Sequence, residues 1–155
     1  MILQEKNLKI MIVFLIGTDV DQRMLLEKKN YLDEFLSRKK TIVFCGALAY
    51  PFLDEIGQFV KMNYIDFSDY EINPAIKHPI WEGVEPKDMM YRKGVAGFYS
   101  RGYNPTPQNV KIINTLGRSK HPIDYEYITK DGGRVLVHCG NNLWLFINDK
   151  TTASK

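Results

Sequence analysis

The sequence predicts a three-layer α/β domain of the flavodoxin-like type, with a mainly parallel sheet and an antiparallel hairpin towards its C-terminal end. Two apolar runs rich in β-branched residues carry this prediction, residues 9–17 (KIMIVFLIG) and 41–51 (TIVFCGALAYP). A short, uninterrupted apolar run is typical of a strand buried on both faces, as in a parallel sheet between layers of helices. The third observation is the tight turn Asp131-Gly132-Gly133, which predicts the hairpin.

The overall composition is that of one soluble globular domain. The chain has 155 residues, of which 45% are hydrophobic and 25% are charged. We expect a single domain over residues 1–150 and a disordered, frayed tail over residues 151–155. The net charge of +3 is spread along the chain without a basic stripe, which argues against a nucleic-acid partner.

The apolar runs indicate that the chain has no membrane span or signal peptide, and the cysteine pattern indicates a reducing compartment. Residues 10–16 are apolar but too few to cross a bilayer, and no small-residue cleavage site follows them. The two cysteines are far apart and each lies in an apolar run, so they do not form a disulfide framework. We therefore expect a soluble, cytoplasmic protein with reduced thiols and no membrane partner.

In the first half of the chain, the pattern predicts strand, helix, strand and helix. Residues 9–17 are the first strand, and Asp21 is a suitable cap for a helix over residues 23–38, where apolar side chains recur at helical spacing. The strand at residues 41–45 follows, which implies a right-handed parallel crossover. Residues 51–60 are expected to form the second helix, because a proline is suited to its first position.

The middle of the chain is irregular. Residues 63–79 lack a sustained period and are interpreted as short strand and loop, with His78 held extended by the proline that follows it. Residues 88–107 combine glycines with basic and aromatic residues. Two interpretations of that segment remain open: a basic loop folded over a pocket, or an irregular connection that needs its glycines for backbone reasons.

Strands return towards the end of the chain. Residues 110–116 and 123–128 are predicted strands, the second of them half-exposed because its apolar and polar residues alternate. Residues 134–138 form the last strand, which is followed by the sequence Cys-Gly-Asn-Asn at residues 139–142.

Candidate chemistry gathers at the carboxyl ends of the predicted parallel strands, where open α/β sheets bind their ligands. Cys45 and His138 each end one of these strands and are the candidate catalytic pair, a thiol nucleophile and its base. Their alternative roles are a small buried hydrophobe and a hydrogen-bonded structural histidine. The candidate ligand-binding residues lie in the adjoining turns and in the glycine-rich loop: Asp19, Gly46, Tyr99, Arg101, Asn141 and Asn142.

We assign no metal and no cofactor. Cys45, His138 and Cys139 carry ligand types that suit zinc, but none of the recognised short ligand spacings is present. The sequence also has neither a phosphate-binding loop nor a dinucleotide fingerprint, so nucleotide cofactors have no support.

Three motifs follow one another along residues 9–146: TIVFCGALAYPFL, a later His-Pro-Ile with a glycine a few residues on, and GGRVLVHCGNNLW. In this order they resemble the class I glutamine amidotransferase-like superfamily, and most closely its ThuA-like branch. The resemblance implies a flavodoxin-like fold. It also implies a cysteine in a strand–turn–helix elbow, activated by a histidine that an acidic residue orients.

The departures from the family pattern shape the functional expectation. A glycine directly follows Cys45 where the family has Gly-x-Cys-x-Gly, and His138 has no carboxylate two residues on. The resemblance therefore implies a domain without the standard triad, which acts as a small-molecule-binding, accessory or regulatory protein. The start is also short by a strand and a helix, and the exposed sheet flank favours a homo-oligomer.

Two other functions remain open at this point. One is a working hydrolase or amidase in which Cys45 attacks a carbonyl, His138 is the base and backbone amides near Gly46 hold the oxyanion. The other is a structural subunit whose shortened sheet docks on another protein.

Overall fold

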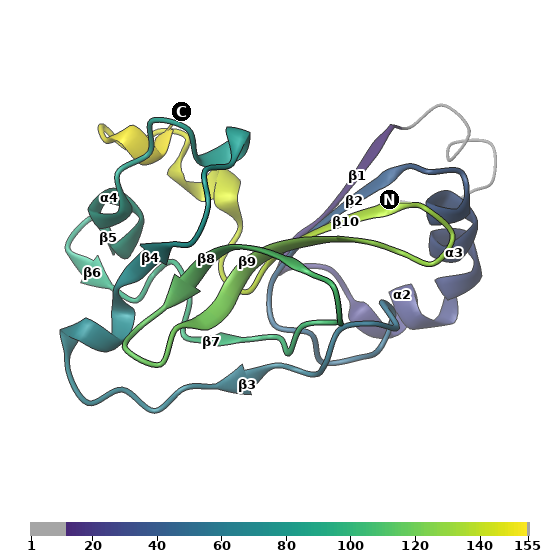
Figure 1. The fold of residues 1–155 in the computed structure, drawn as a ribbon, viewed down its shortest axis with the longest axis horizontal. Coiled ribbons are helices and arrows are strands. Elements are labelled where there is room, and N and C mark those ends of the chain that lie inside the picture. Colours follow the sequence, from purple (N-terminus) through teal and green to yellow (C-terminus); the bar gives the residue numbers. More distant parts are fainter. Residues whose placement is uncertain (1–11, 155) are drawn as a thin grey trace.

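A six-stranded mixed sheet forms the centre of the molecule (Figure 1). The computed structural model describes residues 12–154, so residues 9–11 of the first predicted strand lie outside the described part. In spatial order the strands are β1 (Val13–Ile16), β2 (Thr41–Cys45), β10 (Arg134–His138), β9 (His121–Ile128), β8 (Lys111–Leu116) and β4 (Ile72–Pro74).

The two halves of this sheet have opposite pairing. β2 lies between β1 and β10 and is parallel to both, so the prediction that Cys45 and His138 end parallel strands is confirmed. The other three pairings are antiparallel. The predicted mainly parallel, flavodoxin-like sheet is therefore wrong. The reason is that tight turns join β8 to β9 and β9 to β10, and such short connections can link only antiparallel neighbours.

Two short helices, α2 (Gln22–Glu27) and α3 (Lys29–Ser37), replace the single helix expected over residues 23–38. The Asp21 carboxylate accepts a hydrogen bond from the Arg23 backbone N–H at 2.9 Å, so the predicted cap is confirmed. Both helices lie beside the parallel strands in Figure 1, and α3 buries its apolar side against them, with Phe35 edge-on to Phe14. They form the crossover that makes β1 and β2 parallel.

The second predicted helix, over residues 51–60, does not form. The chain turns back instead, and the Phe59 N–H donates to the Leu48 carbonyl oxygen at 2.9 Å. Phe52 still reaches the core, where its ring packs edge-on against Phe44 with 5.3 Å between ring centroids. The apolar residues of this segment therefore satisfy tertiary contacts rather than a helical period. It leads into β3 (Val60–Lys61), which pairs with β7 (Gly102–Tyr103).

Short turns cover the antiparallel half of the sheet, and His78 is extended, as predicted, at the start of one of them. Figure 1 shows α4 at the opposite end of the molecule from α2 and α3. The covering elements are the 3₁₀ helices η1 (Phe67–Tyr70), η2 (Pro79–Trp81), η3 (Leu143–Phe146) and η4 (Thr152–Ser154), the helix α4 (Pro86–Met90), and the hairpin of β5 (Tyr91–Arg92) and β6 (Val95–Ala96).

Two further predictions, a half-exposed strand over residues 123–128 and a frayed C-terminal tail, are wrong. Residues 123–128 are not a half-exposed strand, because all but Glu126 and Ile128 are buried. Thr152–Ser154 do not form a frayed tail, since the Thr152 hydroxyl and N–H both donate to the Asp88 carboxylate. No helix within residues 12–154 has the length and apolar character needed to cross a membrane.

Candidate functional site

A row of four polar side chains crosses one face of the sheet. The strand register places Cys45 opposite His138, His138 opposite Asp124, and Asp124 opposite Asn114. Residues paired across neighbouring strands project to the same face, so all four lie on the face opposite Phe44. Cys45, His138 and Asp124 are fully buried and Asn114 is 1% exposed. We call this set the polar row and its side of the sheet the cavity face.

The Asp124 carboxylate is the centre of the polar row. One oxygen, Oδ1, lies 2.6 Å from His138 Nδ1. The other, Oδ2, accepts from the Tyr99 hydroxyl at 2.8 Å and from Asn114 Nδ2 at 2.7 Å. An ionised carboxylate can only accept hydrogen bonds. His138 is therefore assigned the tautomer with its proton on Nδ1, and the Asn114 amide is oriented with its nitrogen towards Asp124. A buried charge needs such partners, because without them its desolvation is very costly.

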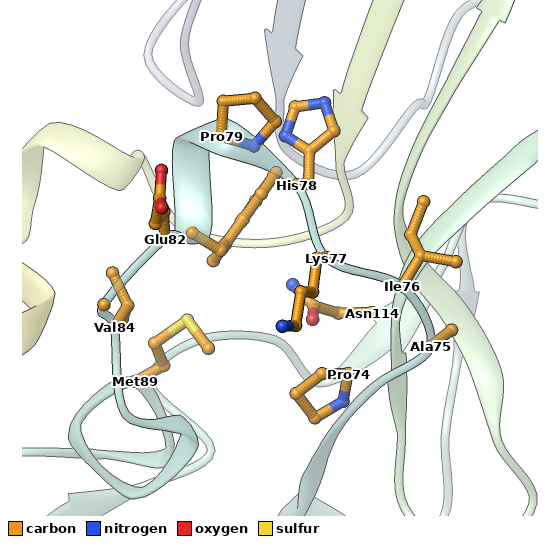
Figure 2. A pocket seen from close by; sticks show the side chains of 12 residues that line it. Pro74, Ala75, Ile76, Lys77, His78, Pro79, Glu82, Val84, Met89 and Asn114 are labelled. Carbon is orange, nitrogen blue, oxygen red and sulfur yellow. The ribbon is translucent and has the colours of Figure 1, made fainter.

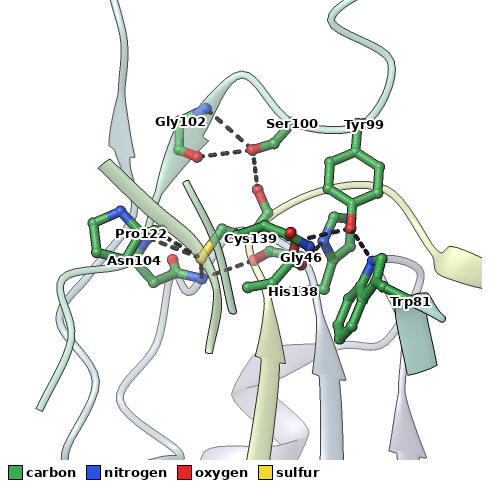
Figure 3. Close-up of polar contacts among 11 residues, drawn as sticks. Gly46, Trp81, Tyr99, Ser100, Gly102, Asn104, Pro122, His138 and Cys139 are labelled. Carbon is green, nitrogen blue, oxygen red and sulfur yellow. Dashed lines mark hydrogen bonds and ion pairs between the residues drawn. The ribbon is translucent and has the colours of Figure 1, made fainter. Parts of the chain in front are cut away.

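Trp81 extends this network away from the sheet. Its indole Nε1–H donates to the Tyr99 hydroxyl at 2.8 Å (Figure 3). That hydroxyl donates onward to Asp124. Burial, and then the nearby Asp124 charge, raise the pKa of Tyr99 well above its ordinary value. Tyr99 therefore stays a neutral hydrogen-bond donor, and the indole of Trp81 is held in one orientation.

The Cys45 thiol lacks the environment of a nucleophile. Burial raises its pKa to about 11, an effect that a hydrogen bond from the backbone at Leu143 only partly offsets. His138 Nε2 is buried and has no hydrogen-bond partner within residues 12–154, so it does not activate the thiol. A thiol that stays protonated at neutral pH is a poor nucleophile. The second cysteine, Cys139, is also buried, and burial raises its pKa further.

The backbone N–H groups of Gly46 and Leu48 already donate hydrogen bonds within the protein. The Gly46 N–H donates to the His138 carbonyl oxygen at 2.9 Å, and the Leu48 N–H donates to Asn104 Oδ1 at 2.9 Å. The Gly46 carbonyl oxygen accepts from Asn104 Nδ2, and Asn104 in turn donates its backbone N–H to the sulfur of Cys139 (Figure 3). These amides are therefore not available to hold an oxyanion, and Gly46 has a structural role.

The other predicted ligand-binding residues do not all converge. Arg101 and Asn141 line a cavity of about 290 Å³ together with Thr18 and Ala47, at the carboxyl ends of the parallel strands; we call it the strand-end cavity. Asn142 is buried and its Oδ1 accepts from the Thr18 N–H at 2.8 Å.

Asp19 and Tyr99 are also outside that cavity. Asp19 is exposed and is not among its lining residues. Tyr99 is 1% exposed and belongs to the Asp124 network instead. A cavity therefore lies at the strand ends, but only two of the predicted ligand-binding residues line it, and neither Cys45 nor His138 does.

A larger cavity, of about 680 Å³, lies over the antiparallel half of the sheet (Figure 2). It is bordered by β4, η2 and the chain that leads to α4, and we call it the η2 cavity. The polar row reaches it at Asn114, and Trp81 forms part of its wall. Its lining residues are Pro74, Ala75, Ile76, Lys77, His78, Pro79, Trp81, Glu82, Gly83, Val84, Met89 and Asn114.

Sequence reasoning missed three residues of this site: Asp124, Asn114 and Trp81. The alternation over residues 123–128 assigned Asp124 to a wet face, whereas the turns that follow β4 cover it. Asp124 could have been found from the predicted hairpin. It lies as many residues before the turn as His138 lies after it, and hairpin pairing places two such residues opposite each other.

The described residues contain no group of three or more histidine, cysteine and acidic side chains that could hold a metal ion. No family model, curated protein or solved structure matches this chain.

Proposed function

We propose that this protein is a non-catalytic small-molecule-binding protein with an accessory or regulatory role, and that its ligand occupies the η2 cavity. The observation that carries the proposal is the contact between this cavity and the polar row at Asn114. An apolar pocket with a few convergent, fixed polar groups is the usual form of a small-molecule site.

The state of the polar row supports binding rather than catalysis. The Cys45 thiol is buried with a raised pKa, and the Gly46 amide is bonded to His138. Kinship with the glutamine amidotransferase-like superfamily remains part of the proposal. The parallel unit of β1, β2 and β10 supports it, whereas the antiparallel pairings of β9, β8 and β4 do not.

Two exposed alanines allow a matched test. Ala75 lines the η2 cavity and Ala47 lines the strand-end cavity. The chain has two tryptophans, so Trp144→Phe leaves Trp81 as the only indole reporter. A fragment library screened by Trp81 fluorescence in this background is expected to give saturable ligands. Ala75→Phe should abolish their binding and Ala47→Phe should leave it unchanged. The reverse pattern, or no saturable ligand, would contradict the proposal.

A second candidate is the cysteine-dependent hydrolase or amidase, and one observation favours it. Asp124 supplies the acidic partner of His138 that is missing two residues beyond it in the sequence. Iodoacetamide distinguishes the two functions. Modification of Cys45 in the native protein near pH 7, lost in His138→Ala, would support the hydrolase. Modification only after unfolding supports the binding protein.

The homo-oligomer also remains a proposal. Within the described residues β1 pairs only with β2, and its outward side chain Leu15 is 56% exposed. Sedimentation at two protein concentrations tests it, and a monomer at both would contradict it.

A further inference from the structure

We infer that the η2 cavity takes a neutral, planar heterocycle that presents an N–H donor beside a hydrogen-bond acceptor, as a lactam or a free nucleobase does. This inference rests on the proposed function and names the chemical class of its ligand.

The side-chain amide of Asn114 has hydrogen-bonding groups that are free to contact a ligand. One hydrogen of Nδ2 is bonded to Asp124, while the described residues provide no partner for the second hydrogen or for Oδ1. The side chain is 1% exposed and points into the cavity in Figure 2. A carboxamide in this state keeps one free acceptor, Oδ1, and one free N–H donor. A cis lactam or a nucleobase edge complements that pair with two hydrogen bonds, as asparagine pairs with adenine.

The backbone also directs Asn114 towards the cavity. The pairing of β8 with β9 is irregular on both sides of Asn114, between Ile112 and Asn114 and between Asn114 and Thr115. Such bulges re-aim a side chain and often lie beside functional sites. The amide cannot turn over, because its nitrogen faces the carboxylate of Asp124.

Trp81 provides a flat wall for the same ligand. Its indole is fixed by the hydrogen bond to Tyr99, whose hydroxyl is fixed in turn by Asp124. The carboxylate of Asp124 therefore positions both the polar edge and the aromatic wall. Stacking on an aromatic side chain is a general way to hold a heterocycle, whatever its substituents.

The charges on the lining favour a neutral ring. Lys77 and Glu82 both line the cavity, carry opposite charges, and make no ion pair within residues 12–154. His78 is used elsewhere: its Nδ1 accepts from the Ile80 N–H, and its Nε2 lies 3.6 Å from Glu126. With the two free charges balanced, a phosphate group would gain little here compared with a neutral base.

Matched heterocycles test the inference in the Trp144→Phe protein. Uracil, adenine and hypoxanthine are titrated against Trp81 fluorescence, and 1,3-dimethyluracil is the control because it keeps the ring but lacks the N–H donors. We expect at least one of the three unmethylated bases to bind saturably. If uracil binds, it should bind at least about tenfold more tightly than 1,3-dimethyluracil. Asn114→Leu should remove that preference.

The outcomes separate this inference from the proposed function. If none of the three bases binds, or if 1,3-dimethyluracil binds as tightly as uracil, the inference is overturned. Fragments that bind and are lost in Ala75→Phe would then still support the proposed function. If Asn114→Leu does not fold, the comparison of uracil with 1,3-dimethyluracil in the Trp144→Phe protein still decides the inference, and Ala75→Phe, which blocks the cavity without removing a group of the Asp124 network, shows whether the base lies there. A base that binds equally well to Ala75→Phe would overturn both.

Discussion

The two halves of the sheet are stabilised in different ways. In the parallel half, β1, β2 and β10 pack against α2 and α3 through apolar side chains such as Leu32 and Phe35, which are fully buried. In the antiparallel half, β9, β8 and β4 lie under short turns and also bury apolar side chains such as Leu116 and Ile123. The difference is that this half contains the buried carboxylate of Asp124, which is hydrogen-bonded to Tyr99, Asn114 and His138. The larger cavity lies in this second half.

The comparison shows how a fold can keep a cavity open. Apolar packing stabilises by filling volume, so the half that relies on it borders only the smaller of the two named cavities, the strand-end cavity. Hydrogen bonds fix positions without filling the space beside them, so a network can hold Trp81 and Asn114 apart around a cavity. The polar half should therefore be sensitive to the loss of single atoms, and the apolar half to the loss of volume.

The largest expected effect is on the polar half. Asp124→Ala leaves the Tyr99 hydroxyl, the Asn114 amide and His138 Nδ1 without their acceptor, and should lower the free energy of unfolding by about 3–5 kcal/mol. Asp33→Ala is the matched control, since Asp33 is an exposed partner of Lys29 and its loss should cost less than about 1 kcal/mol. Urea unfolding followed by circular dichroism measures both. An equal decrease in the free energy of unfolding in both variants would contradict the importance of Asp124.

The apolar half should respond to lost volume. Leu32→Ala removes a fully buried side chain of α3 and should cost about 3 kcal/mol. Leu15→Ala in the same half removes a side chain that is 56% exposed, and should cost less than about 1 kcal/mol. Leu32→Ala should also leave ligand affinity in the η2 cavity unchanged after correction for the unfolded fraction. A loss of affinity would show that the two halves are not independent.

A single hydroxyl should matter in the polar half. Tyr99→Phe removes the donor to Asp124 and the acceptor of Trp81 while keeping the ring, and should cost about 1–3 kcal/mol. Tyr103→Phe is the control, because its ring stacks on His121 and no hydrogen bond of its hydroxyl is found within residues 12–154. Its expected cost is below about 0.5 kcal/mol. Thermal and urea unfolding should rank the pair in this order, and the opposite order would contradict the network.

The smallest effect is a pH dependence at the junction of the halves. The pKa of Cys45 is raised in the folded protein to about 11 from an ordinary value of 9.0. The unfolded chain therefore loses this proton first. The stability from Cys45 is fully present below pH 9.0 and is lost as the pH rises towards 11. By pH 10 the loss is about 1 kcal/mol.

Cys45→Ala should flatten that part of the curve. The quantity to compare is the slope of the unfolding free energy between pH 9 and 10, because the cavity left by the mutation changes the absolute value at every pH. An unchanged slope would mean that the thiol titrates normally in the folded protein and is open to solvent.

Local patterns predicted the parallel half well. The strands ending at Cys45 and His138, their parallel direction and the cap at Asp21 all depend on short stretches of sequence, and the structure has them. The helix predicted over residues 51–60 does not form, and the contacts found there instead, such as Phe52 against Phe44, join segments that the local pattern does not relate.

The candidate site was harder to predict because it is assembled from distant segments. The alternation along residues 123–128 indicates that one face of the strand is more polar than the other. It does not indicate that η2 and α4 cover the more polar face. Asp124 therefore had the sequence signature of an exposed residue. Asn114 is aimed by a bulge, and the register of a strand pair cannot be read from one strand alone.

The most direct test of the account is hydrogen exchange of the two indole N–H groups, measured by NMR in one sample of the wild-type protein. Trp144 is 43% exposed, and the described residues provide no hydrogen bond for its Nε1, whereas Trp81 Nε1 is bonded to Tyr99. Trp144→Phe assigns the two signals. If Asp124 holds the cavity wall through Tyr99, Trp81 should exchange much more slowly than Trp144, and Tyr99→Phe should remove that difference. Equal exchange rates for Trp81 and Trp144 in the wild-type protein would contradict the account.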